Sequence, residues 1–162
     1  MGVTVAFPST LPAGYAWLED EVPFDPARHL ALEAPECITL LSELGYEADE
    51  IARKATPVAA STPFRVLSDE GAEIMLHTAR ELRRFARRAG DRIVSMTRGG
   101  CYRSRWLRDL CISPEVTRHL SDIYGIEVAP HAMPVHLGHI NYEPPEVNTA
   151  VDKWHHDTLA LD

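Results

Sequence analysis

The last stretch of the sequence, VDKWHHDTLALD from Val151 to Asp162, decides the expected fold, because it reads as a strand that carries potential metal ligands. Successive side chains on a strand point to opposite faces, so His155 and Asp157 share one face and His156 lies on the other. Two residues along a strand span ~7 Å, and from there an imidazole and a carboxylate can lean onto one ion. We therefore predict that His155 and Asp157 are metal ligands.

An ordinary surface or core histidine is the alternative, since the pattern HxD is short and often arises by chance. Five of the eight histidines nevertheless lie in the last 32 residues. A structural zinc site prefers closed sets with cysteines, and no cysteine follows Cys111. Mixed histidine and carboxylate ligation with open positions matches the facial triad of non-haem Fe(II) oxygenases. Weaker candidates for a further ligand are His131, His136 and His139, because such histidines more often hydrogen-bond a backbone or face water.

N-cap signals predict three helices in the first part of the chain. Asp25 precedes Pro26, Ser68 precedes two carboxylates, and Ser113 precedes Pro114. The third helix is expected to run to about Tyr124, before a glycine. Apolar side chains at three- and four-residue steps predict a core stripe on the second helix, formed by Met75, Ala79, Leu82 and Ala86.

Weaker patterns complete the expected organisation. Residues 35–44 predict a short helix stopped by a glycine, and Pro134 to Glu143 predicts a strand that breaks near Gly138. We expect one α+β domain over residues 1–162, mainly helical over 1–125, with the first core strands over 126–162. At this length the chain can bury a real core but not two substantial ones.

The composition describes an acidic globular chain. Basic residues number 16 and acidic residues 24, and the net charge of −8 disfavours nucleic acid as a partner. The apolar runs are too short for a membrane span or a signal-peptide core, so we expect a cytoplasmic protein without membrane contact. Three cysteines without a CxxC pair indicate buried thiols, not a disulfide framework. The sequence leaves the oligomeric state open.

Arginines gather in the middle of the chain. Ten of the 16 basic residues lie between Arg80 and Arg108. A solvated helix face with acidic partners is the first interpretation of this cluster, and an anion-binding patch for a phosphate-bearing substrate is the second. The adjacent pair Gly99 and Gly100 indicates a turn far more strongly than a phosphate cradle.

Two segments near the end, DKWHHDT and MPVHLGHIN, resemble the first half of the core in phytanoyl-CoA dioxygenase-like enzymes, which depend on Fe(II) and 2-oxoglutarate. The segment RGGCYRSRWLRDLCISPEV and the helix before it are similar to the helical N-terminal part of the same family. The likeness covers roughly Phe64 onward, and the WHxD motif carries most of its weight. It implies a double-stranded β-helix, or jelly roll, with N-terminal helices packed on one sheet.

The resemblance also implies roles for named residues. His155 and Asp157 would be two of three iron ligands in a dioxygenase that uses 2-oxoglutarate as cosubstrate and hydroxylates a small organic or acyl substrate. A carboxylate at Asp157 favours hydroxylation, because halogenation would need a small residue that leaves room for halide. His139 and Asn141, on the strand before the motif, become candidates for cosubstrate contacts, with polar groups satisfied within the sheet as the alternative.

Two arginines become candidate substrate ligands. Arg98 and Arg103 could line the path of an acidic substrate, with ordinary ion pairs as the alternative. The family's third iron ligand and its 2-oxoglutarate-binding arginine lie far downstream of the WHxD motif, so neither can be assigned up to Asp162. We therefore expect the sequence to be the N-terminal part of a longer oxygenase domain, with a relic that has lost catalysis as the alternative.

Two functions of other classes stay open. A cupin-like module without catalysis would use the histidines to bind a small molecule or a metal, and it would show no turnover of 2-oxoglutarate. A partner-binding domain would instead use the surface between Arg80 and Arg108. It predicts that replacing Arg83, Arg84 and Arg87 abolishes association and leaves metal binding unchanged.

Overall fold

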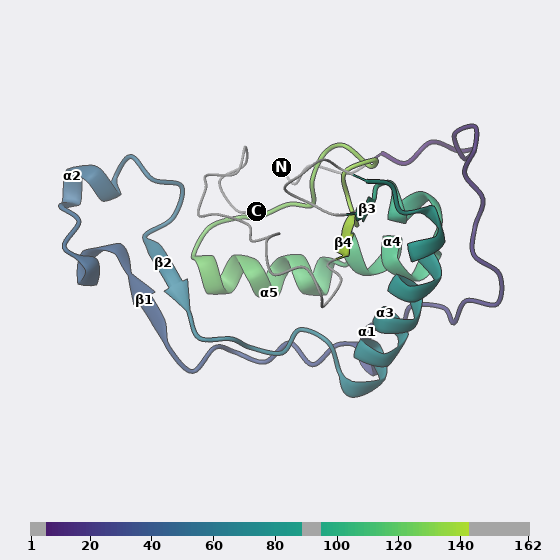
Figure 1. Ribbon diagram of the computed structural model, residues 1–162. Helices are drawn as coiled ribbons and strands as arrows, with labels where there is room; N and C mark the ends of the chain where they lie inside the picture. The colour runs from purple at the N-terminus through teal and green to yellow at the C-terminus, as the bar shows by residue number, and fades with distance from the viewer. Residues whose placement is uncertain (1–5, 89–94, 143–162) are drawn as a thin grey trace.

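The structure is a computed structural model that describes residues 6–88 and 95–142 of the chain. In chain order its elements are α1 (Pro26–His29), β1 (Ile38–Leu40), the 3₁₀ helix η1 (Leu41–Leu44), α2 (Ala48–Ile51), β2 (Val58–Ser61), α3 (Asp69–Leu82), η2 (Arg83–Phe85), β3 (Ser95–Thr97), η3 (Gly100–Tyr102), α4 (Arg105–Cys111), α5 (Pro114–Tyr124) and β4 (Ile140–Tyr142). Figure 1 shows β1, β2 and α2 in a lobe at the left, α5 in the middle, and α1, α3 and α4 at the right. Within the described ranges no helix has the length and apolar character needed to cross a membrane.

The three predicted N-caps are confirmed. At the starts of α1, α3 and α5, the side chains of Asp25, Ser68 and Ser113 each accept a hydrogen bond from a backbone N–H of the first turn. Such a bond satisfies a donor that the helix itself leaves unpaired. α5 ends at Tyr124, and Gly125 follows in the left-handed conformation with φ 67°. These boundaries depend on local chemistry alone, which is why the sequence predicts them well.

The helix predicted over residues 35–44 is wrong. Ile38–Leu40 forms β1, which pairs with β2 in an antiparallel ladder. Only Leu41–Leu44 turns, as a short 3₁₀ helix that ends at Gly45 with φ 84°. Two of the three residues of β1 are β-branched, which favours an extended backbone once a partner strand is available. The glycine stop is therefore correct, whereas the element before it is mainly strand.

The strand predicted from Pro134 to Glu143 is confirmed only near its end. β4 spans Ile140–Tyr142, whereas residues 134–138 form a turn in which the backbone N–H of His136 donates to the carbonyl of Met133 at 3.0 Å. Gly138 has φ 64°, a left-handed conformation that a continuous strand cannot contain. The predicted break at this glycine is thus confirmed, and it separates a turn from a strand.

Both sheets of the described residues are two-stranded and antiparallel, β1 with β2 and β3 with β4. In the second sheet Ser95 pairs with Tyr142 and Thr97 with Ile140. The Thr97 hydroxyl is buried and donates to the carbonyl of Leu82 at 3.0 Å, which ties the sheet to the end of α3. The jelly-roll core predicted for residues 126–162 lies mostly outside the described residues, so it stays a prediction.

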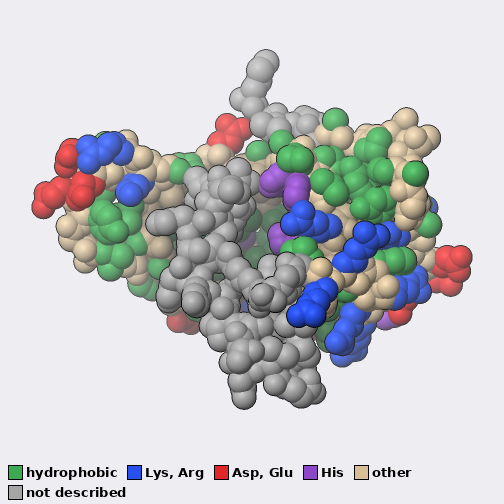
Figure 2. All heavy atoms as spheres, turned by 45° about the horizontal axis from the view of Figure 1, so that its top comes forward, with side chains coloured by type: hydrophobic (Ala, Val, Ile, Leu, Met, Phe, Trp, Pro, Cys, Tyr) green, Lys and Arg blue, Asp and Glu red, His purple; other side chains and the backbone are tan. Residues whose placement is uncertain are grey.

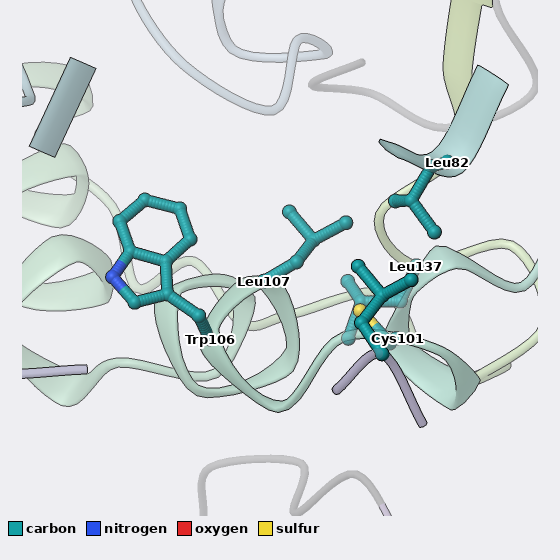
Figure 3. Close-up of a cluster of buried hydrophobic side chains, with 6 residues drawn as sticks. Leu82, Cys101, Trp106, Leu107 and Leu137 are labelled. Carbon is teal, nitrogen blue, oxygen red and sulfur yellow. The ribbon is translucent and has the colours of Figure 1, made fainter. Parts of the chain in front are cut away.

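The segment of residues 6–24, here called the N-terminal arm, contains no helix or strand. The hydrophobic core lies where this arm, the end of α3, η3, α4 and the turn before β4 meet. Its buried side chains are Leu18, Leu82, Cys101, Trp106, Leu107 and Leu137. Figure 3 shows Leu107 between Trp106 on one side and a group formed by Leu82, Cys101 and Leu137 on the other. Leu82 is fully buried, so the predicted stripe faces this core as far as the end of α3, with Met75 packed at its edge. The prediction is wrong for Ala86, which follows η2 with an extended backbone and is not part of the helix. Burial of a leucine of this kind contributes about 1.5–3 kcal/mol.

A buried polar contact fixes α4 against α1. The indole N–H of Trp106 donates to Nδ1 of His29 at 3.1 Å, and the backbone N–H of Asp25 donates to the same nitrogen at 3.0 Å. Because Nδ1 accepts both bonds, a ring proton lies on Nε2, which is buried and has no hydrogen-bond partner among the described residues. His29 is fully buried and joins α1 to α4 through these contacts.

Candidate functional site

The two predicted metal ligands, His155 and Asp157, lie outside the described residues. Within the described ranges no group of three or more His, Cys, Asp or Glu side chains could hold a metal ion. Two of the three other histidines considered as ligands make ordinary backbone contacts. Nδ1 of His131 accepts from the backbone N–H of Met133 at 2.9 Å, and Nδ1 of His139 lies 3.2 Å from the carbonyl oxygen of His136.

His139 and Asn141 are not among the residues that line the cavity shared by Arg98 and Arg103. Asn141 is the central residue of β4 and pairs with Met96 of β3, while His139 directly precedes the strand. Both side chains are exposed. Their predicted contacts with the cosubstrate stay predictions, since they come from the family resemblance.

Arg98 and Arg103 line one cavity of about 750 Å³, here called the arginine cavity. Its walls come from the N-terminal arm, the segment from η2 onward, β3, the end of η3 and the turn before β4. The described residues that line it are Ala13, Gly14, Tyr15, Arg84, Phe85, Ala86, Arg87, Arg88, Met96, Arg98, Arg103 and Val135. Five of these twelve are arginines and none is acidic, so the structure brings the two predicted arginines together with three more.

Backbone pairing places the arginines of the cavity. Arg87 and Met96 exchange both of their backbone hydrogen bonds at 2.9 Å, which attaches the segment after η2 to one edge of β3. β4 pairs with the other edge, so Met96 lies between Arg87 and Asn141. Residues two apart on a strand share a face, and accordingly Nε of Arg98 lies 3.3 Å from the sulfur of Met96.

The glycine pair lets these elements approach closely. The backbone N–H of Gly99 donates to the carbonyl of Val135 at 3.0 Å, and a Cβ at Gly99 would lie 2.7 Å from the Tyr15 hydroxyl. A Cβ at Gly100 would lie 2.3 Å from the carbonyl oxygen of Gly138. Only glycine fits at these contacts. The turn that the pair predicts is confirmed, and its glycines bring the arm and the 134–138 turn against η3.

Arg103 is the most constrained cation of the cavity. Its guanidinium carbon lies 3.8 Å from the ring centroid of Phe85 and 4.5 Å from that of Tyr15, and Nη2 donates to the carbonyl of Gly14 at 3.1 Å. Its Nε is buried and has no hydrogen-bond acceptor among the described residues. Burial lowers the pKa of Arg103 from its ordinary value, and the positive charges of Arg84 and Arg87 lower it further, against an upward contribution from Tyr15. Arg103 thus lies in a field of excess positive charge.

The charges of the cavity are only partly matched by acidic groups. Arg84 pairs with Glu81 at 3.3 Å, and Arg88 also has an interaction partner. For Arg87, Arg98 and Arg103, the part of the chain that the structure describes supplies no carboxylate within ion-pair distance. Figure 2 shows Lys and Arg side chains gathered over the right-hand part of the molecule, beside histidines. This arrangement attracts anions.

A second cavity, of about 720 Å³, has the opposite charge. Its lining includes five acidic residues, and Arg84 lines both cavities. The acidic residues are Glu19, Asp20, Glu21, Glu73 and Glu81. The ion pair between Arg84 and Glu81 therefore lies where the two cavities meet. One cavity is thus lined mainly by basic charges and its neighbour mainly by acidic ones, a division that the net charge of the chain does not reveal.

Sequence reasoning missed Tyr15 and Phe85 as functional residues. Both orient Arg103, yet they lie far from it in sequence and far from each other. Tyr15 belongs to an N-terminal arm without a hydrophobic period, and Phe85 reads as a core residue beside the stripe of α3. In the sequence, only the dense arginines between Arg80 and Arg108 indicate an anion-binding site in this region.

Comparisons of this chain with protein-family models, with curated proteins and with solved structures found no match. Function is therefore inferred from the residues of the chain itself and from the resemblance of its WHxD-containing segment. The geometry of the described residues adds a strongly basic cavity to that sequence pattern.

Proposed function

We propose that the chain belongs to an Fe(II)- and 2-oxoglutarate-dependent dioxygenase that hydroxylates a small acidic organic or acyl substrate. The observation that supports this most is the convergence of Arg98 and Arg103 on one cavity, bounded by β3. β3 pairs with β4, and the chain runs on from β4 toward His155 and Asp157. A substrate held in the arginine cavity would then lie on the same sheet as the strand that leads to the proposed ligands.

The donor chemistry fits a ferrous ion. His155 offers an imidazole nitrogen and Asp157 a carboxylate oxygen, and this mixed set is typical of non-haem iron sites with open positions. A facial triad has three protein ligands, so the proposed pair would hold iron together with a third ligand. When bound, iron and 2-oxoglutarate would supply the oxidising chemistry of hydroxylation.

The residues of the chain would bind and orient the substrate and would exclude water from it. Arg98 and Arg103 would hold the acidic group of the substrate through charge-assisted hydrogen bonds, while Phe85 and Tyr15 fix the plane of the Arg103 guanidinium. His139, which directly precedes β4, and Asn141 within β4 would contact the cosubstrate. Positioning of this kind is what a protein contributes when the cofactor carries the reaction.

The test is formation of succinate from 2-oxoglutarate by the full chain, with and without Fe(II). We expect His155→Ala and Asp157→Ala to abolish it. His156→Ala is the matched control, because it removes an imidazole from the adjacent position, which in the predicted strand would face the other side. Turnover that survives loss of His155, or that proceeds equally without iron, would contradict the proposal.

A non-catalytic small-molecule-binding module is the second candidate. It is favoured by one observation: the described residues form a strongly basic cavity, which can bind an anion without any metal. This candidate predicts that an acidic ligand binds in the arginine cavity with the same affinity whether or not Fe(II) is added. Binding without any iron-dependent turnover would therefore select the module over the oxygenase.

A further inference from the structure

We propose that the arginine cavity binds the phosphate group of a phosphorylated small organic molecule, with Arg87, Arg98 and Arg103 as its ligands. The proposal rests on the proposed function in that it names the class of substrate for the same cavity. Its test measures binding in the absence of iron, so the two proposals can fail separately.

Positive charge gathers around the arginine cavity. Five arginines line the cavity, and the described residues that line it include no acidic group. Two of the five, Arg84 and Arg88, have partners. The other three, Arg87, Arg98 and Arg103, have no carboxylate within ion-pair distance in the described ranges. Like charges gathered around one cavity repel each other, so a bound anion with more than one negative charge would stabilise the arrangement.

The candidate phosphate ligands are spread over the chain. The three guanidinium groups come from different segments: Arg87 follows η2, Arg98 follows β3, and Arg103 follows η3. Donors supplied by three segments around one cavity would suit a tetrahedral group with several oxygens better than the two coplanar oxygens of one carboxylate. Guanidinium groups bind phosphate through paired N–H donors, and the cations among the described lining residues are all arginines.

The side chain of Arg103 is held in place before any ligand binds. Arg103 lies against Phe85 at 3.8 Å, and its Nη2 is held by the carbonyl of Gly14. A guanidinium that is already oriented loses little conformational freedom when an anion binds. Its buried Nε has no acceptor among the described residues, although a buried donor normally has one. A ligand oxygen would supply that acceptor.

The cavity also has an apolar part and room for more than a phosphate group. Phe85, Met96 and Val135 add apolar surface to the same cavity. At about 750 Å³ the space exceeds what a lone phosphate fills and falls within the range of small-molecule sites. The ligand is therefore a phosphate ester of a small organic molecule, with its carbon part against the apolar side chains.

The experiment is calorimetric titration of the full chain with inorganic pyrophosphate, in a phosphate-free buffer at low ionic strength and without iron. Succinate serves as the dicarboxylate comparison. The variants are Arg87→Gln and Arg98→Gln, both at exposed positions, and the matched control is Arg118→Gln, an exposed arginine of α5 that does not line the cavity.

We expect pyrophosphate to bind more tightly than succinate, and each cavity variant to weaken it about tenfold to a hundredfold, as loss of a charge-assisted hydrogen bond would. Arg118→Gln should leave the affinity unchanged. Three results would each overturn the proposal: no binding of pyrophosphate, equal binding of succinate, or equal weakening by Arg118→Gln. Arginine-dependent binding without iron-dependent turnover would uphold this proposal and remove the oxygenase.

Discussion

The guanidinium group of Arg103 lies over the ring of Phe85, with its central carbon 3.8 Å from the ring centroid. Together with the hydrogen bond to the carbonyl of Gly14, this contact joins the N-terminal arm to η2. We expect Arg103→Ala to lower the free energy of unfolding by about 1–2 kcal/mol, measured by urea denaturation. Arg53→Ala is the control, because its exposed ion pair with Asp49 contributes about 0–1 kcal/mol. Equal losses in the two variants would contradict the structural role of Arg103.

Gly100 touches the turn before β4 so closely that no side chain fits between them. A Cβ at this position would lie 2.3 Å from the carbonyl oxygen of Gly138 and 2.9 Å from Cδ2 of Leu107. Gly100→Ala should therefore push η3 away from the turn and lower the free energy of unfolding by about 1–3 kcal/mol. Urea denaturation measures this directly. A variant as stable as the parent chain would show that the two backbones do not meet as described.

The three cysteines should differ in reactivity. Cys37 is exposed, so the prediction of a buried thiol is wrong for this residue, whereas Cys101 is fully buried. The hydrogen bond with Cys111 and burial raise the pKa of the Cys101 thiol far above its ordinary value, whereas the same hydrogen bond lowers the pKa of Cys111. Because the thiolate is the reactive form, we expect a maleimide reagent to modify Cys37 first and Cys101 only after unfolding. Peptide mass spectrometry over time would measure the order, and early modification of Cys101 would contradict the described core.

Acid should weaken the start of α5. The Ser113 hydroxyl donates to Oε2 of Glu115 at 2.8 Å, and this bond, aided by the backbone N–H of Glu115, lowers the pKa of that carboxyl. A carboxylate whose pKa is lowered in the folded state stabilises the fold above its unfolded pKa, about 4.3, and this contribution is lost as pH falls through the folded value.

We therefore expect Glu115→Gln to lose less stability than the parent chain between neutral pH and about pH 3, measured by urea midpoints. Glu36→Gln is the matched control, since Glu36 is exposed and lies outside the helices. It should lose as much stability as the parent chain. An acid response of Glu115→Gln equal to that of both other chains would show that the hydrogen bond from Ser113 contributes nothing.

Local chemistry made part of the fold predictable. The caps at Asp25, Ser68 and Ser113 and the glycine after α5 act within one helical turn, so the sequence near each of them is sufficient. β1 and β3 are three residues long, too short to show a period of two, and each depends on a partner far along the chain. The partner strand β2 is not visible in residues 35–44 themselves, so the local cap and glycine stop of this segment predict a helix there.

The candidate site shows the same division. The arginine cluster is visible in the sequence, but which of its members meet is decided by the pairing of Arg87 with Met96 and by the stacking of Arg103 on Phe85. Neither contact leaves a pattern in a single sequence. His155 and Asp157 lie outside the described residues, so the metal site stays a prediction from strand geometry and family resemblance.

The central claim is that His155 and Asp157 bind a ferrous ion, and anaerobic titration of the full chain with Fe(II), in the presence of 2-oxoglutarate, tests it most directly. The account predicts saturable, stoichiometric binding that is lost in His155→Ala and in Asp157→Ala and retained in His156→Ala. Iron binding that is absent from the parent chain, or that is unchanged in all three variants, would contradict it.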